Sequence, residues 1–352
     1  MKLKKTWVII IAIIAIIGLT VGGILLFSGR KDSKPEKEQE EASKEATEEI
    51  IESNVKIIDL NSNTRPYAIM INCRDEALPQ AGLQDAYIIY EEMVEGGITR
   101  MMALFKDKDL SKVGSVRSAR VQYLPYVFEN DAIYMHAGGS PESIKRMSDE
   151  NIAEVDVDGQ YGQRDMELAK KRAWEHTLFT NSKLITKGLT DKNIRTTTKV
   201  KSLLKYSEEE LDLSKYKTGT AKKVSIKYSN YRTSIYEYDK DKLNYKRFMN
   251  KKKNTDLITG EQYTAKNIIV YGVNYESYTY HSKTQYQRPA IIGTGEGYYI
   301  TDGVSLPITW EKKDEKSKTI YKIKETGEDL VVNDGNTYIQ IYPTNGGSLI
   351  IE

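Results

Sequence analysis

Three features of the sequence predict an α/β domain with a mixed sheet and a β-rich domain behind an N-terminal transmembrane helix. An uncharged apolar run fills residues 7–27, strand-like and helix-like segments alternate over residues 61–188, and short alternating segments fill residues 221–352. The 352 residues are enough for two domains of ordinary size. A net charge of +2 gives no electrostatic argument for a nucleic-acid partner, so we expect none.

The first 31 residues predict an uncleaved signal anchor. Three lysines precede the run from Trp7 to Phe27, which can span a hydrocarbon core of about 30 Å at about 1.5 Å per residue. No cysteine lies near its end, so there is no thiol for lipid attachment. Because the basic N-terminus favours the inside, we expect a single-pass membrane protein whose bulk is extracytoplasmic. Residues 32–60 are charged and lack aromatic residues, which predicts a disordered spacer.

Residues 61–188 predict the α/β domain. Runs bounded by Gly, Pro, Asn and Asp predict strands at Pro66–Asn72, Ala86–Glu92, Thr99–Lys106 and Ala132–Met135. Helices are predicted at Ser118–Phe128, which Pro125 should kink or shorten, and at Pro141–Met147 and Ser182–Lys187. A hairpin-like pair around Glu95–Gly97 indicates that the sheet is mixed. Residues 189–220 are polar and lysine-rich, which predicts a linker region, and the period of two after it predicts the β-rich domain at residues 221–352.

Arginines at the ends of these elements are candidate anion ligands. If Ser118 caps a helix, Arg117 and Arg120 lie beside its N-terminus, where guanidinium groups suit a carboxylate or a phosphate. The alternative is that both arginines form structural ion pairs with a glutamate cluster, which consists of Glu91, Glu92 and Glu95.

A glycine turn follows the predicted strand that ends near His136. Gly138 and Gly139 precede Ser140, a favoured N-cap, and Pro141, a favoured first helical residue. Backbone N–H groups in such a turn can point at an anion, next to a histidine at a strand end. The alternative is an ordinary strand-to-helix connection with a hydrogen-bonded histidine.

A third cluster combines Glu95, Gly96, Gly97, Thr99 and Arg100 in one tight turn. Neighbouring carboxylates separate their pKa values, so the glutamate cluster could supply the acid and the base of a cell-wall hydrolase, with Glu92 or Glu95 in the reaction. The alternative is a hairpin with solvated charges. Whether the chain is an enzyme is left open by these patterns.

The histidines, the cysteine and the tryptophans do not indicate a further functional site. The three histidines are scattered and the single Cys73 lies in a predicted strand, so we expect no metal site, no cofactor and no disulfide. Trp174, in the sequence Trp-Glu-His, is expected in the core.

Several blocks of the sequence resemble the YerB-like family of bacterial envelope proteins. They are RPYAIMIN, PQAGLQDAYIIYEEMVEGGITRMMALF, VGSVRSARVQYL and DAIYMHAGGSP, followed by GEGYYITDG and NDGNTYIQIYP, within residues 62–350. The resemblance implies a surface location and two domains but brings no established reaction. This chain differs from the lipoprotein members of the family, because it has no lipobox cysteine. The family's motif positions fall here on Glu95, Gly96, Gly97, Thr99, Arg100, Arg117, Ser118, Arg120, His136, Gly138, Gly139 and Ser140.

The leading hypothesis is that the first domain binds an anionic ligand or protein partner of the cell envelope. In it, Arg100, Arg117 and Arg120 contact the anion, and Glu95, His136, Gly138, Gly139 and Ser140 complete the pocket. The alternatives are the envelope hydrolase and a structural partner of a cell-wall or division complex.

Overall fold

The structure is a computed structural model that describes residues 54–352. The predicted anchor at residues 1–31 and most of the predicted spacer lie outside the described residues. Within residues 54–352, no helix is long and apolar enough to cross a membrane. The chain is already held in place at Ile57, whose backbone N–H donates to the Asp334 carboxylate at 3.0 Å, and Ile58 is 4% exposed. Packing therefore begins ahead of Asn61, where the sequence predicts the first domain to start.

The predicted strands of the N-terminal half are confirmed, with ends shifted by one or two residues. The strands are β1 (Tyr67–Asn72), β2 (Ile88–Met93), β3 (Thr99–Phe105), β4 (Val113–Gly114), β5 (Ile133–His136), β6 (Glu154–Asp156), β7 (Gln163–Arg164) and β8 (Leu178–Thr180). The helices are α2 (Leu124–Glu129), α3 (Pro141–Asp149), α4 (Met166–Ala169) and α5 (Ser182–Asp191). Short 3₁₀ turns are η1 (Asp75–Ala77), η2 (Leu83–Asp85), η3 (Glu95–Gly97), η4 (Val121–Tyr123) and η5 (Trp174–His176).

The C-terminal half consists of strands. They are β9 (Lys205–Ser207), β10 (Gly219–Thr220), β11 (Lys223–Lys227), β12 (Thr233–Asp239), β13 (Asn244–Met249), β14 (Lys252–Lys253), β15 (Thr264–Ala265), β16 (Asn267–Val273), β17 (Tyr275–Tyr278), β18 (Tyr286–Pro289), β19 (Gly293–Thr301), β20 (Val304–Lys312), β21 (Ile320–Ile323), β22 (Val331–Asn333), β23 (Thr337–Pro343) and β24 (Ser348–Ile351). The predicted β-rich character of this half is therefore correct.

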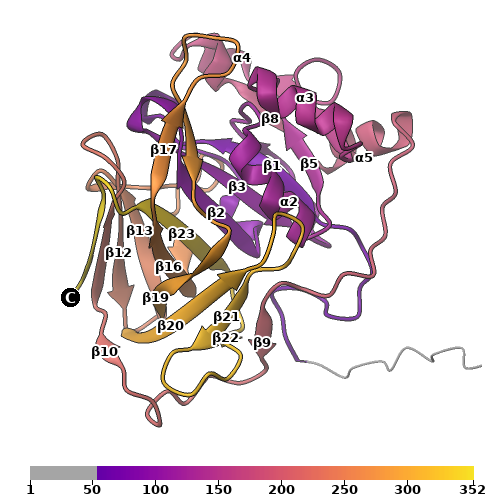
Figure 1. Ribbon diagram of the computed structural model, residues 1–352. Helices are drawn as coiled ribbons and strands as arrows, with labels where there is room; N and C mark the ends of the chain where they lie inside the picture. Colours follow the sequence, from indigo (N-terminus) through magenta and orange to yellow (C-terminus); the bar gives the residue numbers. More distant parts are fainter. Residues whose placement is uncertain (1–53) are drawn as a thin grey trace, which may run out of the picture. The chain divides into compact units, whose positions relative to one another are not determined.

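One large sheet joins the two halves (Figure 1). Its strand order is β10-β20-β19-β16-β23-β2-β3-β1-β5-β6, with β21 paired to β20. Strand β23 pairs in parallel with β2 on one side and with β16 on the other. Because β3 is antiparallel to both β2 and β1, the strands β1, β2, β5, β6, β16 and β23 all point the same way. Their carboxyl ends meet at one edge of the sheet, which we call the carboxyl edge.

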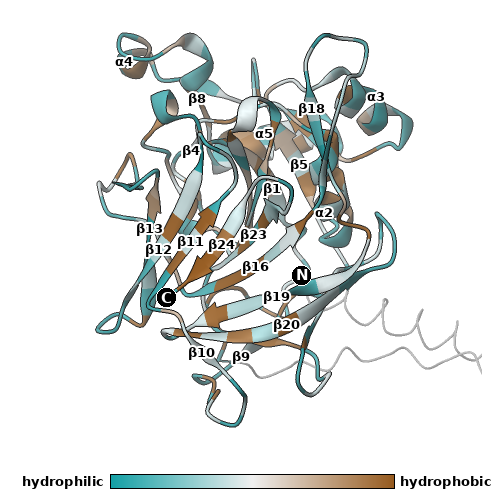
Figure 2. Cartoon of the chain, turned by 60° about the vertical axis from the view of Figure 1, so that its left-hand side comes forward, coloured by the Kyte–Doolittle hydropathy of each residue, from teal (hydrophilic) through white to brown (hydrophobic). Residues whose placement is uncertain are grey.

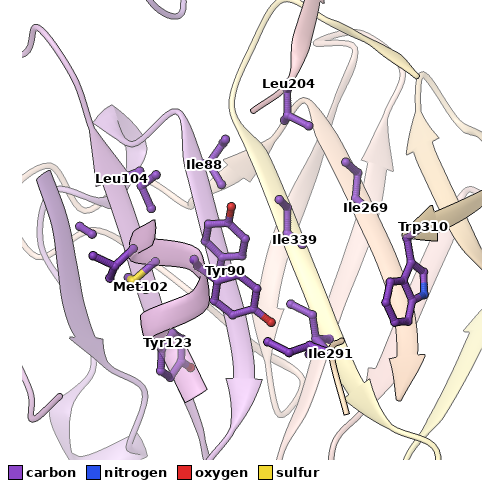
Figure 3. Packing of buried hydrophobic residues seen from close by; sticks show 14 of the residues in the cluster. Ile88, Tyr90, Met102, Leu104, Tyr123, Leu204, Ile269, Ile291, Trp310 and Ile339 are labelled. Carbon is purple, nitrogen blue, oxygen red and sulfur yellow. The ribbon is translucent and has the colours of Figure 1, made fainter. Parts of the chain in front are cut away.

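Both faces of this sheet are covered, so its central strands are apolar at successive positions. On one face, Tyr90 of β2, Ile269 of β16 and Ile339 of β23 belong to a core that also includes α2, β9 and β22 (Figure 3). On the other face, Ile89 and Tyr338 pack with residues of α5 and of a second sheet, ordered β14-β13-β12-β11-β24. Hydrophobic residues run along β11 and β24 of that sheet (Figure 2).

A buried ion pair connects the two sheets. Arg247 of β13 donates from Nη2 to Oε2 of Glu91 in β2 at 2.8 Å, and both side chains are completely buried. Glu91 also accepts a hydrogen bond from Thr99 at 2.7 Å. Substituting only one partner of such a buried ion pair lowers the stability of the fold strongly, because the remaining charge stays buried and keeps its desolvation penalty.

We therefore expect Arg247→Met to lower the free energy of unfolding by about 3–5 kcal/mol, because it leaves Glu91 buried without a counter-ion. The double variant with Glu91→Leu should recover most of this loss. Urea unfolding of the two single variants and the double variant measures both effects. Lys223→Met is the control, because its ion pair with Glu237 is exposed and should contribute less than about 1 kcal/mol. A cost for Arg247→Met no larger than that of the control would contradict the prediction.

Candidate functional site

The segment from Gly114 to Arg120 runs along the carboxyl edge between β1 and the turn after β5. The backbone N–H of Arg117 donates to Met70 of β1 at 2.9 Å, and the carbonyl of Arg117 accepts from Ala137, after β5, at 3.0 Å. The N–H of Ala119 donates to Gly138 at 2.9 Å. Parallel strands of α/β sheets place ligands at this edge.

The predicted helix from Ser118 is wrong at its start. Arg120 has extended backbone angles, a single 3₁₀ turn follows at Val121–Tyr123, and α2 begins only at Leu124. The reason is that the backbone groups of residues 117–119 already pair with β1 and with the turn after β5, so they cannot form a helical turn. Pro125 lies in the first turn of α2, where its missing N–H is not needed.

Three of the predicted site residues contact one another. Arg120 donates from Nε to Oε2 of Glu95 at 2.9 Å, and its Nη2 also contacts Oε1. Arg100 lies 3.6 Å from the same Oε1. Burial opposes ionisation of Glu95, but Arg120 and Arg100 outweigh it and lower its pKa to about 2. Burial, together with the charge of Arg120, lowers the pKa of Arg100 to about 10. The buried guanidinium of Arg100 and the partly buried guanidinium of Arg120 therefore share one carboxylate.

Arg117 has a different environment. Its Nη1 donates to the backbone carbonyl of Glu175 at 3.2 Å, and no ion pair within 4.0 Å involves Arg117 or Arg74 in residues 54–352. Burial lowers the pKa of Arg117, and the positive charges of Arg120 and Arg74 lower it further, against the opposing charge of Glu175. Arg117 and its exposed neighbour Arg74 are thus the cations of this cluster whose charge is still available.

Sequence reasoning missed Arg74 and His176. Arg74 comes two residues after β1 ends at the carboxyl edge, which is the signal that could have identified it. His176 is 2% exposed, and its Nδ1 accepts a hydrogen bond from the Asn72 amide at 2.9 Å. Burial lowers the pKa of His176, and Arg117 lowers it further, so this histidine stays neutral beside the arginines.

The predicted glycine turn is bonded to the protein itself. His136 is 1% exposed, with Nδ1 at 2.9 Å from the Gly138 carbonyl and Nε2 at 3.1 Å from Glu154. The N–H of Gly138 donates to Asp156 at 3.1 Å. Ser140 caps α3 as predicted, accepting from the N–H of Ser143 at 3.2 Å. These groups hold the turn in place, and their partners belong to the chain, so the geometry does not direct them at a ligand.

The glutamate cluster is not arranged for glycan hydrolysis. Glu91 is buried in its pair with Arg247, and both oxygens of Glu95 contact Arg120. Glu92 is completely buried, and burial raises its pKa to about 8 although hydrogen bonds from Tyr126 and Gln122 oppose the shift. Hydrolysis needs two carboxyl groups flanking an accessible bond, and none of the three reaches solvent freely.

The C-terminal half also reaches this site. The hairpin of β17 and β18 follows β16 past the carboxyl edge, and the ring of Tyr286 lies 5.9 Å from the Arg120 guanidinium carbon. Tyr278 donates to Glu142 of α3 at 2.6 Å, and Arg288 donates to the same carboxylate at 3.0 Å. In the described part of the chain, no three His, Cys, Asp or Glu side chains are grouped so that they could hold a metal ion.

Comparisons with known proteins cover both halves of the chain. The family model described as "Protein of unknown function (DUF3048) N-terminal domain" matches residues 54–195, and the corresponding C-terminal domain matches residues 224–339. A Bacillus subtilis protein named "Putative lipoprotein YerB" is 26% identical over 291 residues, which are 79% of this chain and 81% of that protein. The crystal structure of the YerB protein from Bacillus subtilis matches with a TM-score of 0.68 at 24% identity, covering 82% of this chain and 94% of the other. This structural likeness supports the two-domain, sheet-rich fold.

The raised pKa of Glu92 predicts a pH dependence of stability. Between its usual value of 4.5 and the folded value of about 8, the folded chain holds a proton that the unfolded chain has released. The free energy of unfolding therefore falls as the pH rises through this window, by about 1.4 kcal/mol per unit of pKa difference. Glu92→Gln should remove this dependence and exceed the wild type in stability at pH 8.

Urea unfolding at pH 5 and pH 8 measures the effect. Glu167→Gln is the control and should keep the pH dependence of the wild type, because Glu167 is exposed on α4. If the change in stability between pH 5 and pH 8 is the same in the wild type and in Glu92→Gln, then Glu92 is ionised in the fold and the prediction is wrong.

Proposed function

Since this chain belongs to the YerB-like family, we propose that it is a membrane-associated, extracytoplasmic protein that binds an anionic group of the cell envelope through Arg117 and Arg74. The observation that carries the proposal is an excess of positive charge at the carboxyl edge. Arg117 lies within electrostatic reach of Arg74, Arg100 and Arg120, and among the described residues Glu95 is the carboxylate that pairs with two of these arginines.

An anion at this place relieves the repulsion between the guanidinium groups. The repulsion contributes to the pKa of Arg117, which burial lowers, the charge of Glu175 opposes, and the charges of Arg120 and Arg74 lower further. A guanidinium presents several N–H donors in a plane, which matches a carboxylate or a phosphate. Arg117 uses one of these donors on the Glu175 carbonyl, so others are available to a ligand.

The anchor belongs to the same proposal. The relative is named a lipoprotein, whereas this sequence has its single cysteine at Cys73, inside the fold. The apolar run at residues 7–27 would take the place of a lipid and hold the described residues outside the membrane as a single-pass anchor. The hydrolase hypothesis gains no support from the buried carboxyl groups described above.

Replacing the two available arginines tests the site. Hydrogen bonds to charged groups contribute about 1.5–3 kcal/mol, so Arg117→Ala should weaken binding of a short poly(ribitol phosphate) chain roughly tenfold. Adding Arg74→Ala should weaken it further, with little change in thermal stability, since neither side chain has an ion-pair partner in residues 54–352. Isothermal titration calorimetry at low ionic strength measures the affinity. Arg195→Ala is the matched control, because it removes the same charge at the opposite edge of the sheet, beside Asp131. Equal losses in the control would indicate unspecific charge attraction.

Glu95 competes with the ligand for the same cations, so Glu95→Gln should act in the opposite direction. The amide keeps the shape of the side chain but leaves Arg100 and Arg120 without a counter-charge. We expect the free chain to lose about 2 kcal/mol of stability and the anion to bind several-fold more tightly. Thermal melts with and without the polymer check both effects together. Unchanged affinity in Glu95→Gln would restrict Arg100 and Arg120 to a structural role.

A further inference from the structure

The loop between β7 and β8 carries an exposed tryptophan beside the candidate site. Trp174 is 55% exposed, so the expectation that it lies in the core is wrong. The reason is that residues 165–177 form the connection between β7 and β8, which belong to a separate sheet ordered β4-β8-β7. The α4 helix of this loop lies at the top of Figure 1, where the β17–β18 hairpin also ends. An exposed indole presents a large ring with a polar N–H to solvent, and its position beside a cationic site makes it a candidate contact residue.

This loop is held rigidly. Arg172 donates to the carbonyl groups of Ala77 at 2.9 Å and Leu78 at 2.8 Å, which fastens the loop to the C-terminal end of η1. Asp165 caps α4 through the N–H groups of Glu167 and Leu168, each at 3.0 Å. A rigid loop loses little conformational entropy when it binds, which favours a role in recognition.

The ring of Trp174 is itself oriented by a neighbour. The guanidinium of Arg164 lies 4.9 Å from the ring centroid, and its Nη1 donates to the Trp174 carbonyl at 2.6 Å. Arg164 also pairs with Asp158 at 2.8 Å. One side of the indole thus rests on a fixed cation, while more than half of the residue stays open to solvent.

Trp174 is adjacent to the proposed anion site in the chain and in space. The next residue, Glu175, provides the carbonyl that accepts from Arg117. Nη1 of Arg117 therefore lies 3.2 Å from the backbone of the residue that directly follows Trp174. Cation and aromatic ring together define a ligand with an anionic group next to a flat, partly apolar face.

We propose that the ligand is an anionic glycan, with a sugar ring stacked on Trp174 and its phosphate or carboxylate held by Arg117 and Arg74. This inference rests on the proposed function and names its ligand class. The C–H groups on one face of a sugar ring carry partial positive charge, which suits the negative π face of an indole.

Two polymers separate the sugar contact from the charge contact. The full chain in detergent is titrated with poly(ribitol phosphate) that carries N-acetylglucosamine and with the same polymer without sugar. Trp174→Ala should weaken binding of the glycosylated polymer roughly tenfold and leave binding of the bare polymer unchanged. Arg117→Ala should weaken both. Met166→Ala is the matched control, because Met166 is 60% exposed on the same loop and should have no effect on either.

Fluorescence gives a second readout. The chain has three tryptophans, and Trp310 is 4% exposed in the core, so it should not respond to a surface ligand. The glycosylated polymer should shift the emission to shorter wavelength in the wild type but not in Trp174→Phe.

The outcomes distinguish this inference from the proposed function. Equal losses for both polymers in Trp174→Ala, or equal affinity of the wild type for both, would overturn the glycan contact while leaving the anion site intact. Normal binding of both polymers by Arg117→Ala would overturn the anion site itself. Loss of binding to phosphatidylglycerol vesicles in Trp174→Ala, without an effect on either polymer, would identify a membrane contact and overturn the glycan.

Discussion

The insertion of β23 between β2 and β16 is the constraint on which the rest of the structure depends. Residues 337–343 pair in parallel with strands from both halves of the chain, so the two halves share one sheet and one direction. The carboxyl ends of β1, β2, β5 and β16 therefore meet at a common edge. Because β17 continues directly from β16, the hairpin it begins extends past this edge and brings Tyr286 next to Arg120. A site built on the N-terminal half thus receives part of its surroundings from the C-terminal half.

Individual strands, helix caps and turns of this chain could be predicted, because each is determined by residues a few positions apart in the sequence. The strand at residues 67–72, the cap at Ser140 and the hairpin at Glu95–Gly97 follow from apolar runs, cap residues and glycines that act over a few positions. The shared sheet could not be predicted this way. Strands β16 and β23 look like strands of a separate β domain, and only their pairing partners, far away in the sequence, show that they lie at the centre of a sheet covered on both faces. The helix expected from Ser118 failed for the same reason, since distant strands occupy its backbone groups.

The candidate site was predictable as a set of residue types but not as a set of roles. Glycines and arginines at strand ends led to Glu95, Arg100, Arg117 and Arg120, which the structure does bring together at the carboxyl edge. No sequence pattern could show that Glu95 takes two of these arginines and leaves Arg117 with a backbone carbonyl. His136 has both ring nitrogens engaged, which depends on Glu154 and Gly138 in three dimensions. Trp174 was misplaced because a large aromatic residue is usually buried, and its exposure depends on the loop that Arg172 fastens to Ala77 and Leu78.

The distribution of the three clustered glutamates explains why a surplus of positive charge persists at this edge. Glu91 is next to the site in sequence, but it neutralises Arg247 between the two sheets. Glu92 is sealed in the core, where burial raises its pKa to about 8 and keeps it uncharged at neutral pH. Glu95 alone of the three remains ionised toward the site, where burial is outweighed by Arg120 and Arg100, which together hold its pKa at about 2. The cluster therefore sets one negative charge against four arginines, and Glu175 is a further carboxylate near Arg117. The same folding that buries two glutamates leaves Arg117 and Arg74 without an ion-pair partner among the described residues, which makes anion binding a consequence of how the sheets pack.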